Sequence, residues 1–193
     1  MPKVPEVFFK PAQCLNDPCG DILVPSTAPS ALDAEVELAV VIGKDCKNVD
    51  QASALDYVLG YTVANDVTAR DVQSRVTQWG FSKGYDGFCP LGPVIVRADA
   101  PGFDVKNLPM KTTLSGEILQ DGNTSEMIFS VEEIVSYLSQ DTTLPAGTVI
   151  ITGTPSGIGH SYSPPKYIRP GDELSVSIGG GLGSLKNSIV AAR

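Results

Sequence analysis

The sequence predicts an α+β fold in which strands predominate. Most of its apolar stretches are short and end at glycine or proline, which is typical of strands joined by turns. Two stretches, 50–59 and 130–138, have the clearest apolar spacing of a helix. A hydrophobic fraction of 42% with 19% charged residues is ordinary for a globular chain. The 193 residues are therefore expected to form one domain, 1–193, around a buried core.

The first thirty residues are expected to form an extended amino-terminal segment of that same domain. Prolines separate short apolar pieces such as Val7–Phe9 and Ile22–Val24, and this spacing disfavours a helix. From Ala34 to Ile42 the sequence first alternates and then becomes continuously apolar. This pattern predicts a strand that begins at a cleft and ends in the core, where Gly43 closes it.

The remaining elements follow from capping residues, spacing and turns. Residues 50–59 are predicted to form a helix with Asp50 as its N-cap, and a short strand through Tyr61 and Val63 follows. A further helix is predicted over 68–76. Ser130–Glu133 fits a capping box, which predicts a helix up to Leu138. The other predicted strands cover residues 93–96, 112–119 with a turn at 115–116, 148–152, 174–178 and 184–190, with a hairpin at 179–183.

Charge and composition argue against several classes of protein. The chain has 14 Lys and Arg against 22 Asp and Glu, a formal charge of −8, which has the wrong sign for nucleic-acid binding. No apolar run approaches the ~20 residues of a membrane span. The amino terminus resembles neither a secretory signal nor a transit peptide. We therefore expect a cytoplasmic protein without membrane or nucleic-acid partners, and the spacing of its four cysteines predicts free thiols.

Three acidic residues are the strongest candidates for chemistry. Glu35 and Glu37 lie two apart on a predicted strand, so their side chains leave the same face with Cα atoms about 6–7 Å apart. That spacing alone is also typical of a solvated strand face. Asp66, at the end of the next strand, adds a second acidic site in a comparable position. Three carboxylates without Cys or His beside them favour Mg²⁺, with Mn²⁺ or Ca²⁺ as alternatives, over zinc.

Further polar residues follow Asp66 along the chain. Arg70 and Gln73 share one face of the helix predicted over 68–76, where they either hold a substrate carboxylate and carbonyl or form an exposed turn. Lys83 stands between aromatic residues and glycines, so we expect partial burial beside an anionic partner. The loop Thr152–Gly159 offers hydroxyls and backbone amides but lacks the lysine of a phosphate-binding loop, so nucleotide binding is not expected.

These motifs together resemble the fumarylacetoacetate hydrolase family. The similarity runs from about Pro5 to Val190, and the family motifs occur in order at Glu35–Leu38, Gly60–Asp71, Lys83–Asp86, Pro90–Pro93 and Thr152–Gly159. The resemblance implies a β-rich roll of packed mixed sheets with a few peripheral helices, usually as a homodimer. It also implies a set of site residues: Glu35, Glu37 and Asp66 as magnesium ligands, Lys83 as a catalytic lysine, and Arg70, Gln73 and Thr154 as substrate-binding residues.

The resemblance further implies an enzyme that acts on small 2-oxo acids. The leading hypothesis is hydrolytic cleavage of a carbon–carbon bond in an acylpyruvate or similar β-dicarbonyl acid, through a metal-stabilised enolate. Family members usually carry a His and a Glu on a water-activating lid ahead of the segment matching Val7–Pro11, and this sequence has no such motif. His160 does not match that histidine and is not expected to be catalytic. Oxaloacetate decarboxylation or keto–enol tautomerisation, which need no attacking water, and a non-catalytic binding subunit are the alternatives.

Overall fold

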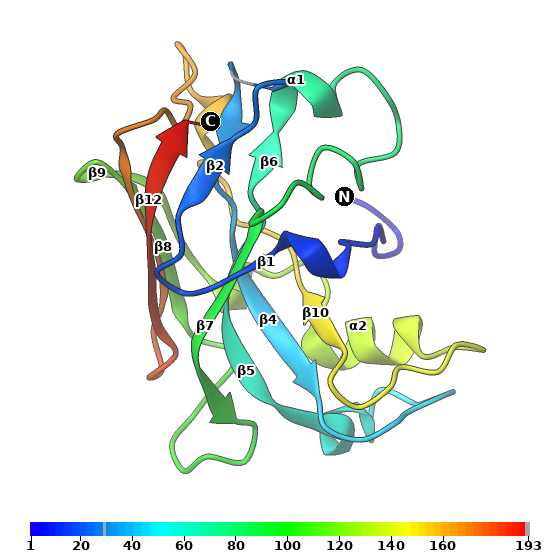
Figure 1. Cartoon of the computed structure of the whole chain (residues 1–193). Coiled ribbons are helices and arrows are strands. Elements are labelled where there is room, and N and C mark those ends of the chain that lie inside the picture. The colour runs from blue at the N-terminus through cyan, green and yellow to red at the C-terminus, as the bar shows by residue number, and fades with distance from the viewer. Residues whose placement is uncertain (29, 192–193) are drawn as a thin grey trace.

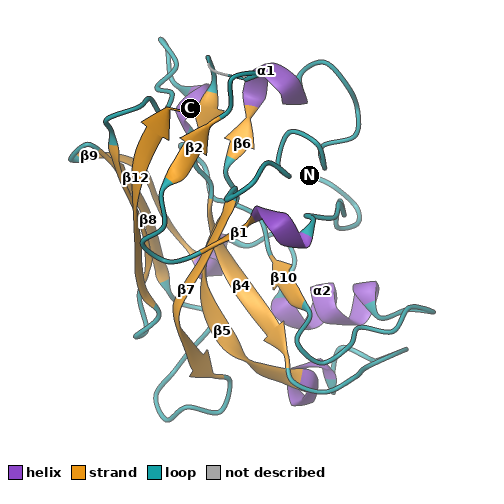
Figure 2. Cartoon of the chain, viewed as in Figure 1, coloured by secondary structure: helices purple, strands orange, loops and turns teal. Residues whose placement is uncertain are grey.

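Two mixed β-sheets pack against each other in the computed structural model, which describes residues 1–28 and 30–191 (Figure 1). The first sheet has the strand order β1 (Leu15–Asn16), β7 (Cys89–Arg97), β5 (Val58–Asn65), β4 (Val36–Ile42) and β10 (Val149–Ile151). The second has the order β2 (Ile22–Val24), β12 (Gly183–Ala191), β11 (Glu173–Ile178), β8 (Pro109–Leu114) and β9 (Glu117–Asn123). Strands predominate over helices, so the predicted α+β, β-rich fold class is confirmed (Figure 2).

The helices among the described residues are short and few. They are α1 (Arg70–Gln73), α2 (Val131–Leu138) and 3₁₀ turns at Ala12–Cys14, Ala54–Tyr57, Thr124–Glu126 and Gly159–Ser161. The predicted capping box of α2 is present, because Ser130 accepts from the Glu133 amide at 3.2 Å while the Glu133 carboxylate accepts from the Ser130 amide at 2.7 Å. None of these helices has the length and apolar content needed to cross a lipid bilayer.

The core lies between the two sheets, and β4 is its central strand. All seven residues of β4 are buried, as its continuous apolar run predicts. β4 pairs antiparallel with β5 on one side and with β10 on the other. The predicted hairpins also form: β8 and β9 turn at Ser115 and Gly116, which both have positive φ, and β11 and β12 pair up to Gly183. The four cysteines are free thiols, as predicted.

Two predicted helices are wrong. Residues 50–59 contain only the 3₁₀ turn that ends at Tyr57, and β5 begins at Val58 because its backbone pairs with Ile42 of β4. Likewise, α1 is four residues long, because Thr68 and Ala69 form β6 (Thr68–Ala69) opposite β3 (Leu32–Asp33). In both places pairing with a strand distant in sequence overrides the local helical spacing.

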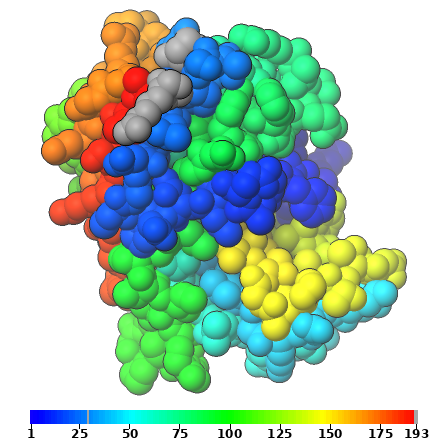
Figure 3. Space-filling view, viewed as in Figure 1, coloured from blue at the N-terminus to red at the C-terminus, as the bar shows by residue number. Residues whose placement is uncertain are grey.

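The amino-terminal segment contains β1 and β2 but no strand before residue 15. Its first residues cross one face of the molecule, where they appear in dark blue between the green and yellow parts of the chain (Figure 3). The predicted extended piece at Val7–Phe9 belongs to this crossing, and Val7 and Phe9 are exposed.

Candidate active site

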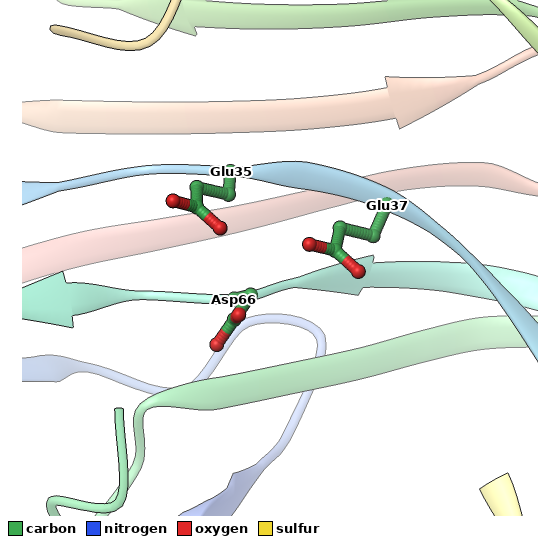
Figure 4. A group of neighbouring side chains, drawn as sticks. All are labelled: Glu35, Glu37 and Asp66. Atoms are coloured by element: carbon green, nitrogen blue, oxygen red, sulfur yellow. The ribbon is translucent and has the colours of Figure 1, made fainter. Parts of the chain in front are cut away.

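Three carboxylates meet beside the point where β4 begins and β5 ends (Figure 4). Glu35 immediately precedes β4, Glu37 is the second residue of that strand, and Asp66 follows β5. The strand register places Asp66 at the level of Glu35, and the Asp66 amide donates to the Glu35 carbonyl at 2.9 Å. One carboxylate oxygen from each residue lies within 4.8 Å of the other two. All three are buried, so the alternative of a solvated strand face is wrong.

Lys83 projects into this cluster. Its Nζ donates to Glu35 Oε2 at 2.9 Å, to Asp66 Oδ2 at 2.6 Å and to the Thr68 hydroxyl at 2.8 Å. Burial works to lower the pKa of Lys83, but the Glu35 and Asp66 carboxylates outweigh burial and raise the pKa above its usual value. The side chain is therefore a buried ammonium held by anionic partners, as expected from its sequence neighbours.

Arg70 and Gln73 lie side by side at the start of α1. Arg70 Nη1 donates to Gln73 Oε1 at 3.0 Å, so the predicted shared face is confirmed. The guanidinium is buried and points at carboxylates: Nε donates to Asp33 Oδ2 at 2.9 Å, and Nη2 lies 2.6 Å from Glu35 Oε1. An exposed turn is therefore wrong for Arg70, which holds one of the three clustered carboxylates in place.

Asp33 was missed by sequence reasoning. This buried carboxylate accepts from Arg70 Nε and from the backbone amides of Gly159 at 2.8 Å and His160 at 3.0 Å. It thereby links α1 to the loop that follows β10. The available signal was its place two residues before Glu35, in the same alternation of acidic residues. His160 itself takes part through its backbone, while its ring Nδ1 lies 2.7 Å from the Tyr167 hydroxyl.

The loop after β10 closes the other side of the cluster. The Gly153 amide donates to Glu37 Oε2 at 2.7 Å. Burial, followed by the nearby Asp66 and Glu35 carboxylates, raises the pKa of Glu37 well above its usual value. Glu37 is thus the member of the cluster whose negative charge is least compensated.

Thr154 is positioned by a glutamine that the sequence did not single out. Gln120, on β9 and buried, donates from Nε2 to the Thr154 hydroxyl at 2.7 Å and to the Pro155 carbonyl at 2.9 Å. Its Oε1 accepts from the Val36 amide at 3.1 Å. One side chain therefore fixes the loop to the beginning of β4, and only the folded sheets bring these residues together.

Lys10 is a second lysine in the cluster and was also missed. Its Nζ donates to Asp66 Oδ1 at 2.7 Å, to the Phe88 carbonyl at 3.2 Å and to the Lys83 carbonyl. With Lys83 on Oδ2, both oxygens of Asp66 are bound by ammonium groups. The sequence offered no signal for Lys10, because it lies in an extended segment 56 residues before its partner.

The donor set fits a divalent cation with a preference for oxygen. Counted as formal charges, the carboxylates of Asp33, Glu35, Glu37 and Asp66 exceed the cations Lys10, Arg70 and Lys83 by one. Buried carboxylates that converge with excess negative charge are the ligands that Mg²⁺ and Ca²⁺ prefer. The raised pKa of Glu37 is consistent with this, since a bound cation or a proton would relieve the repulsion.

A cleft of about 1190 Å³ opens on this cluster. The residues that line it include Glu37, Lys10 and Thr154, together with the amino-terminal segment and the chain around β10. The volume exceeds the 300–1,000 Å³ or so of a typical small-molecule site. Arg70, Gln73 and Lys83 lie behind these lining residues, and their predicted roles toward substrate and catalysis stay predictions.

Comparison with known proteins agrees with this architecture. The family model described as fumarylacetoacetate (FAA) hydrolase C-terminal matches residues 1–190. Oxaloacetate tautomerase YisK of Bacillus subtilis is 42% identical over 190 residues, which cover 98% of this chain and 62% of that protein. Caffeoylpyruvate hydrolase of Neonothopanus nambi is 42% identical over 193 residues, which cover 98% of this chain and 61% of that protein. The chain thus spans less than two thirds of the length of these curated relatives.

Solved structures give the same picture. A fumarylacetoacetate hydrolase from psychrophilic Exiguobacterium antarcticum has a TM-score of 0.92 and 42% identity, covering 96% of this chain and 66% of that one. A 2-hydroxyhepta-2,4-diene-1,7-dioate isomerase from Mycobacterium marinum has a TM-score of 0.88 and 41% identity, covering 98% of this chain and 70% of that one. Proteins named for hydrolysis, tautomerisation and isomerisation therefore share this fold.

Proposed function

Because the chain belongs to the fumarylacetoacetate hydrolase family, we propose that it is a divalent-metal-dependent enzyme that acts on small 2-oxo acids through an enolate. The single observation that carries this proposal is the buried convergence of Glu35, Glu37 and Asp66 around a space that also faces Lys83. A scaffold protein would gain nothing from three buried carboxylates with uncompensated charge, since such a cluster lowers stability. The alternative of a non-catalytic binding subunit is therefore less favoured.

Glu35, Glu37 and Asp66 are the proposed metal ligands, with Mg²⁺ as the first candidate. The bound cation would polarise the 2-oxo group and stabilise the negative charge of the enolate. Arg70 holds Glu35 in place through a buried ion pair, and Gln73 orients Arg70 in turn. These two residues thus support a ligand, in addition to any contact with the substrate.

Lys83 and Thr154 are the proposed residues for the substrate itself. Lys83 is a permanent ammonium whose positive charge favours the enolate over the ketone, so it acts as an electrostatic catalyst. The Thr154 hydroxyl accepts from Gln120, which leaves its own proton free to donate to a substrate carboxylate. Both groups are preorganised by hydrogen bonds, so they need little rearrangement during the reaction.

Keto–enol tautomerisation of oxaloacetate is the reaction we propose first. It needs one proton to move between carbon 3 and the 2-oxo oxygen, and enolate stabilisation is the main demand on the protein. Two relatives carry that name, the Bacillus protein and the mitochondrial human FAHD2A, which is 41% identical over 192 residues. Decarboxylation of oxaloacetate would use the same enolate.

Hydrolytic cleavage of an acylpyruvate is the second candidate. The large cleft beside Thr154 favours it, because its lining includes Phe129 and Tyr137 and leaves room for a bulky acyl group. The relative named caffeoylpyruvate hydrolase supports the same reaction class. Hydrolysis also requires an activated water, a demand that tautomerisation does not make.

The test is turnover by the purified chain with Mg²⁺, followed as loss of enol absorbance from oxaloacetate and, in parallel, as cleavage of acetylpyruvate. Glu35→Gln should abolish the heat of Mg²⁺ binding and lower the rate about 10²-fold or more. Glu173→Gln, which changes an exposed carboxylate on β11, is the matched control and should behave like the wild type. Full turnover in excess EDTA, or an unaffected Glu35→Gln variant, would contradict the proposal.

The homodimer implied by the family resemblance stays a prediction. Sedimentation velocity of the purified chain measures the oligomeric state directly.

A further inference from the structure

The amino-terminal segment, defined here as residues 5–11, is held over the candidate active site by side chains. Among the residues that the structure describes, no backbone group of residues 1–10 forms a hydrogen bond with another backbone group. The position of the segment therefore depends on what its side chains contact. Lys10 and Phe8 make the contacts that reach the site.

Lys10 supplies the charged anchor. Its ammonium, in a side chain only 10% exposed, bonds to Asp66 Oδ1 at 2.7 Å and to two backbone carbonyls. A charge-assisted bond of this kind is about twice as strong as a neutral one. Asp66 is also a proposed metal ligand, so the carboxylate that fastens the segment is one that a cation would bind.

Phe8 supplies the second contact. Its ring packs edge-on against Trp79, with centroids 5.9 Å apart, and lies 5.3 Å from Lys83 Nζ. When Lys10 holds Asp66, Phe8 therefore covers the ammonium that the proposed mechanism uses. Gly84 allows this close approach, since a Cβ at that position would lie 3.1 Å from Pro11.

The charge on the site decides how strongly Lys10 is attracted. Without Lys10, the carboxylates of Asp33, Glu35, Glu37 and Asp66 exceed Arg70 and Lys83 by two formal charges. A bound divalent cation brings that remainder to zero, and the anion of a 2-oxo acid makes it negative again. A proton on Glu37 changes the starting value by one, but the cation would displace that proton and reach the same end point.

We propose that Lys10 is a positioning residue that fastens the amino-terminal segment over the site through Asp66, releases it when a divalent cation binds, and closes it again on the substrate anion. The fastening follows from the contacts of Lys10 alone. The release and the reclosing rest on the proposed function. By linkage, a cation that loosens the segment must also bind more tightly when the segment is already loose.

Trp79 reports the position of the segment, because it is the only tryptophan in the chain and contacts Phe8. Acrylamide quenching of its fluorescence in the metal-free protein should be about twofold or more stronger in Lys10→Met than in the wild type. Lys10→Arg, which keeps the charge, should restore most of the protection. Lys47→Met removes an exposed lysine and should leave quenching unchanged. Circular dichroism of each variant shows that it is folded.

The second arm titrates Mg²⁺ while calorimetry records its binding. In the wild type, quenching should increase with the same midpoint as the binding heat, and pyruvate added to the Mg²⁺-loaded protein should reduce it again. Lys10→Met should show no change in quenching with Mg²⁺ and should bind Mg²⁺ more tightly. It should also raise KM for oxaloacetate by a larger factor than it lowers kcat, because closure contributes to anion binding.

Each outcome decides part of the proposal. Equal quenching in Lys10→Met and the wild type overturns the fastening. Mg²⁺ that binds by calorimetry without increasing the quenching of the wild type overturns the release. If calorimetry detects no Mg²⁺ binding at all, the proposed function fails and the release fails with it, while the Lys10→Met comparison still decides the fastening.

Discussion

Replacing Lys83 by methionine tests whether the buried acidic cluster depends on its ammonium. Methionine keeps most of the length and apolar contact of the lysine stem but removes the charge. Three hydrogen bonds are lost, to Glu35, Asp66 and Thr68. Glu35 retains Arg70 and Asp66 retains Lys10. The excess of negative charge in the cluster nevertheless doubles from one to two.

The distances set the size of the effect. At an effective dielectric constant of about 20, unit charges separated as Lys83 is from Glu35 and Asp66 attract by about 6 kcal/mol each. The desolvation of the buried ammonium offsets several kcal/mol of this attraction. Removing one partner from a buried charge cluster typically costs about 3–5 kcal/mol, and we expect a loss near the lower end, since both carboxylates keep a second cation.

Urea unfolding followed by far-ultraviolet circular dichroism measures this loss, with Lys47→Met as the charge-matched control at an exposed site. Mg²⁺ at about 100 times its Kd stabilises the wild type by about 2.7 kcal/mol. The stabilisation should be larger in Lys83→Met, because no ammonium competes for the carboxylates, so the two proteins become more similar in Mg²⁺. Turnover should still fall about 10²–10³-fold. A loss below about 1 kcal/mol without metal, or a gap that widens with Mg²⁺, would refute this account of the cluster.

Three further changes address single contacts. Burial raises the pKa of Glu37 above its model value of 4.5, so the free energy of unfolding of the metal-free protein should fall as pH rises from there toward the raised value. Glu37→Gln should flatten that decline in urea midpoints between about pH 5 and about pH 8, and an unchanged slope would contradict the assignment. Gln120→Leu should cost about 1–3 kcal/mol of stability and raise KM, because Thr154 loses its donor; unchanged kinetics would show that Thr154 is not positioned this way. Gly157→Ala should lower both stability and turnover, because Gly157 has a φ of +94° and a Cβ there would lie 2.4 Å from the Leu119 carbonyl; a wild-type melting temperature would contradict this.

Local patterns in the sequence predicted a large part of the fold. The continuous apolar run after Glu37 predicted the buried strand β4, and the capping box at Ser130 predicted α2. The turn at 115–116 and the glycines at 179–183 predicted two hairpins. These features are encoded within a few residues, where side-chain alternation, capping and turn geometry act directly on the backbone.

Neighbouring strands also made the core of the candidate site predictable. Glu35 and Glu37 share a face because strand side chains alternate, and Asp66 joins them because β5 pairs antiparallel with β4. The partners of these carboxylates did not follow from the sequence. Lys10 reaches Asp66 across 56 residues, and Gln120 reaches Val36 across 84.

The sequence by itself determined which strands form and that three acidic side chains converge at the start of one of them. Only the tertiary structure decided which cations neutralise them, that Arg70 faces inward, and that residues 50–59 become a 3₁₀ turn and a strand. The physical reason is the range of the interactions. Alternation and capping act over a few residues, whereas burial and charge compensation depend on which distant segments the packed sheets bring within a few ångströms of one another.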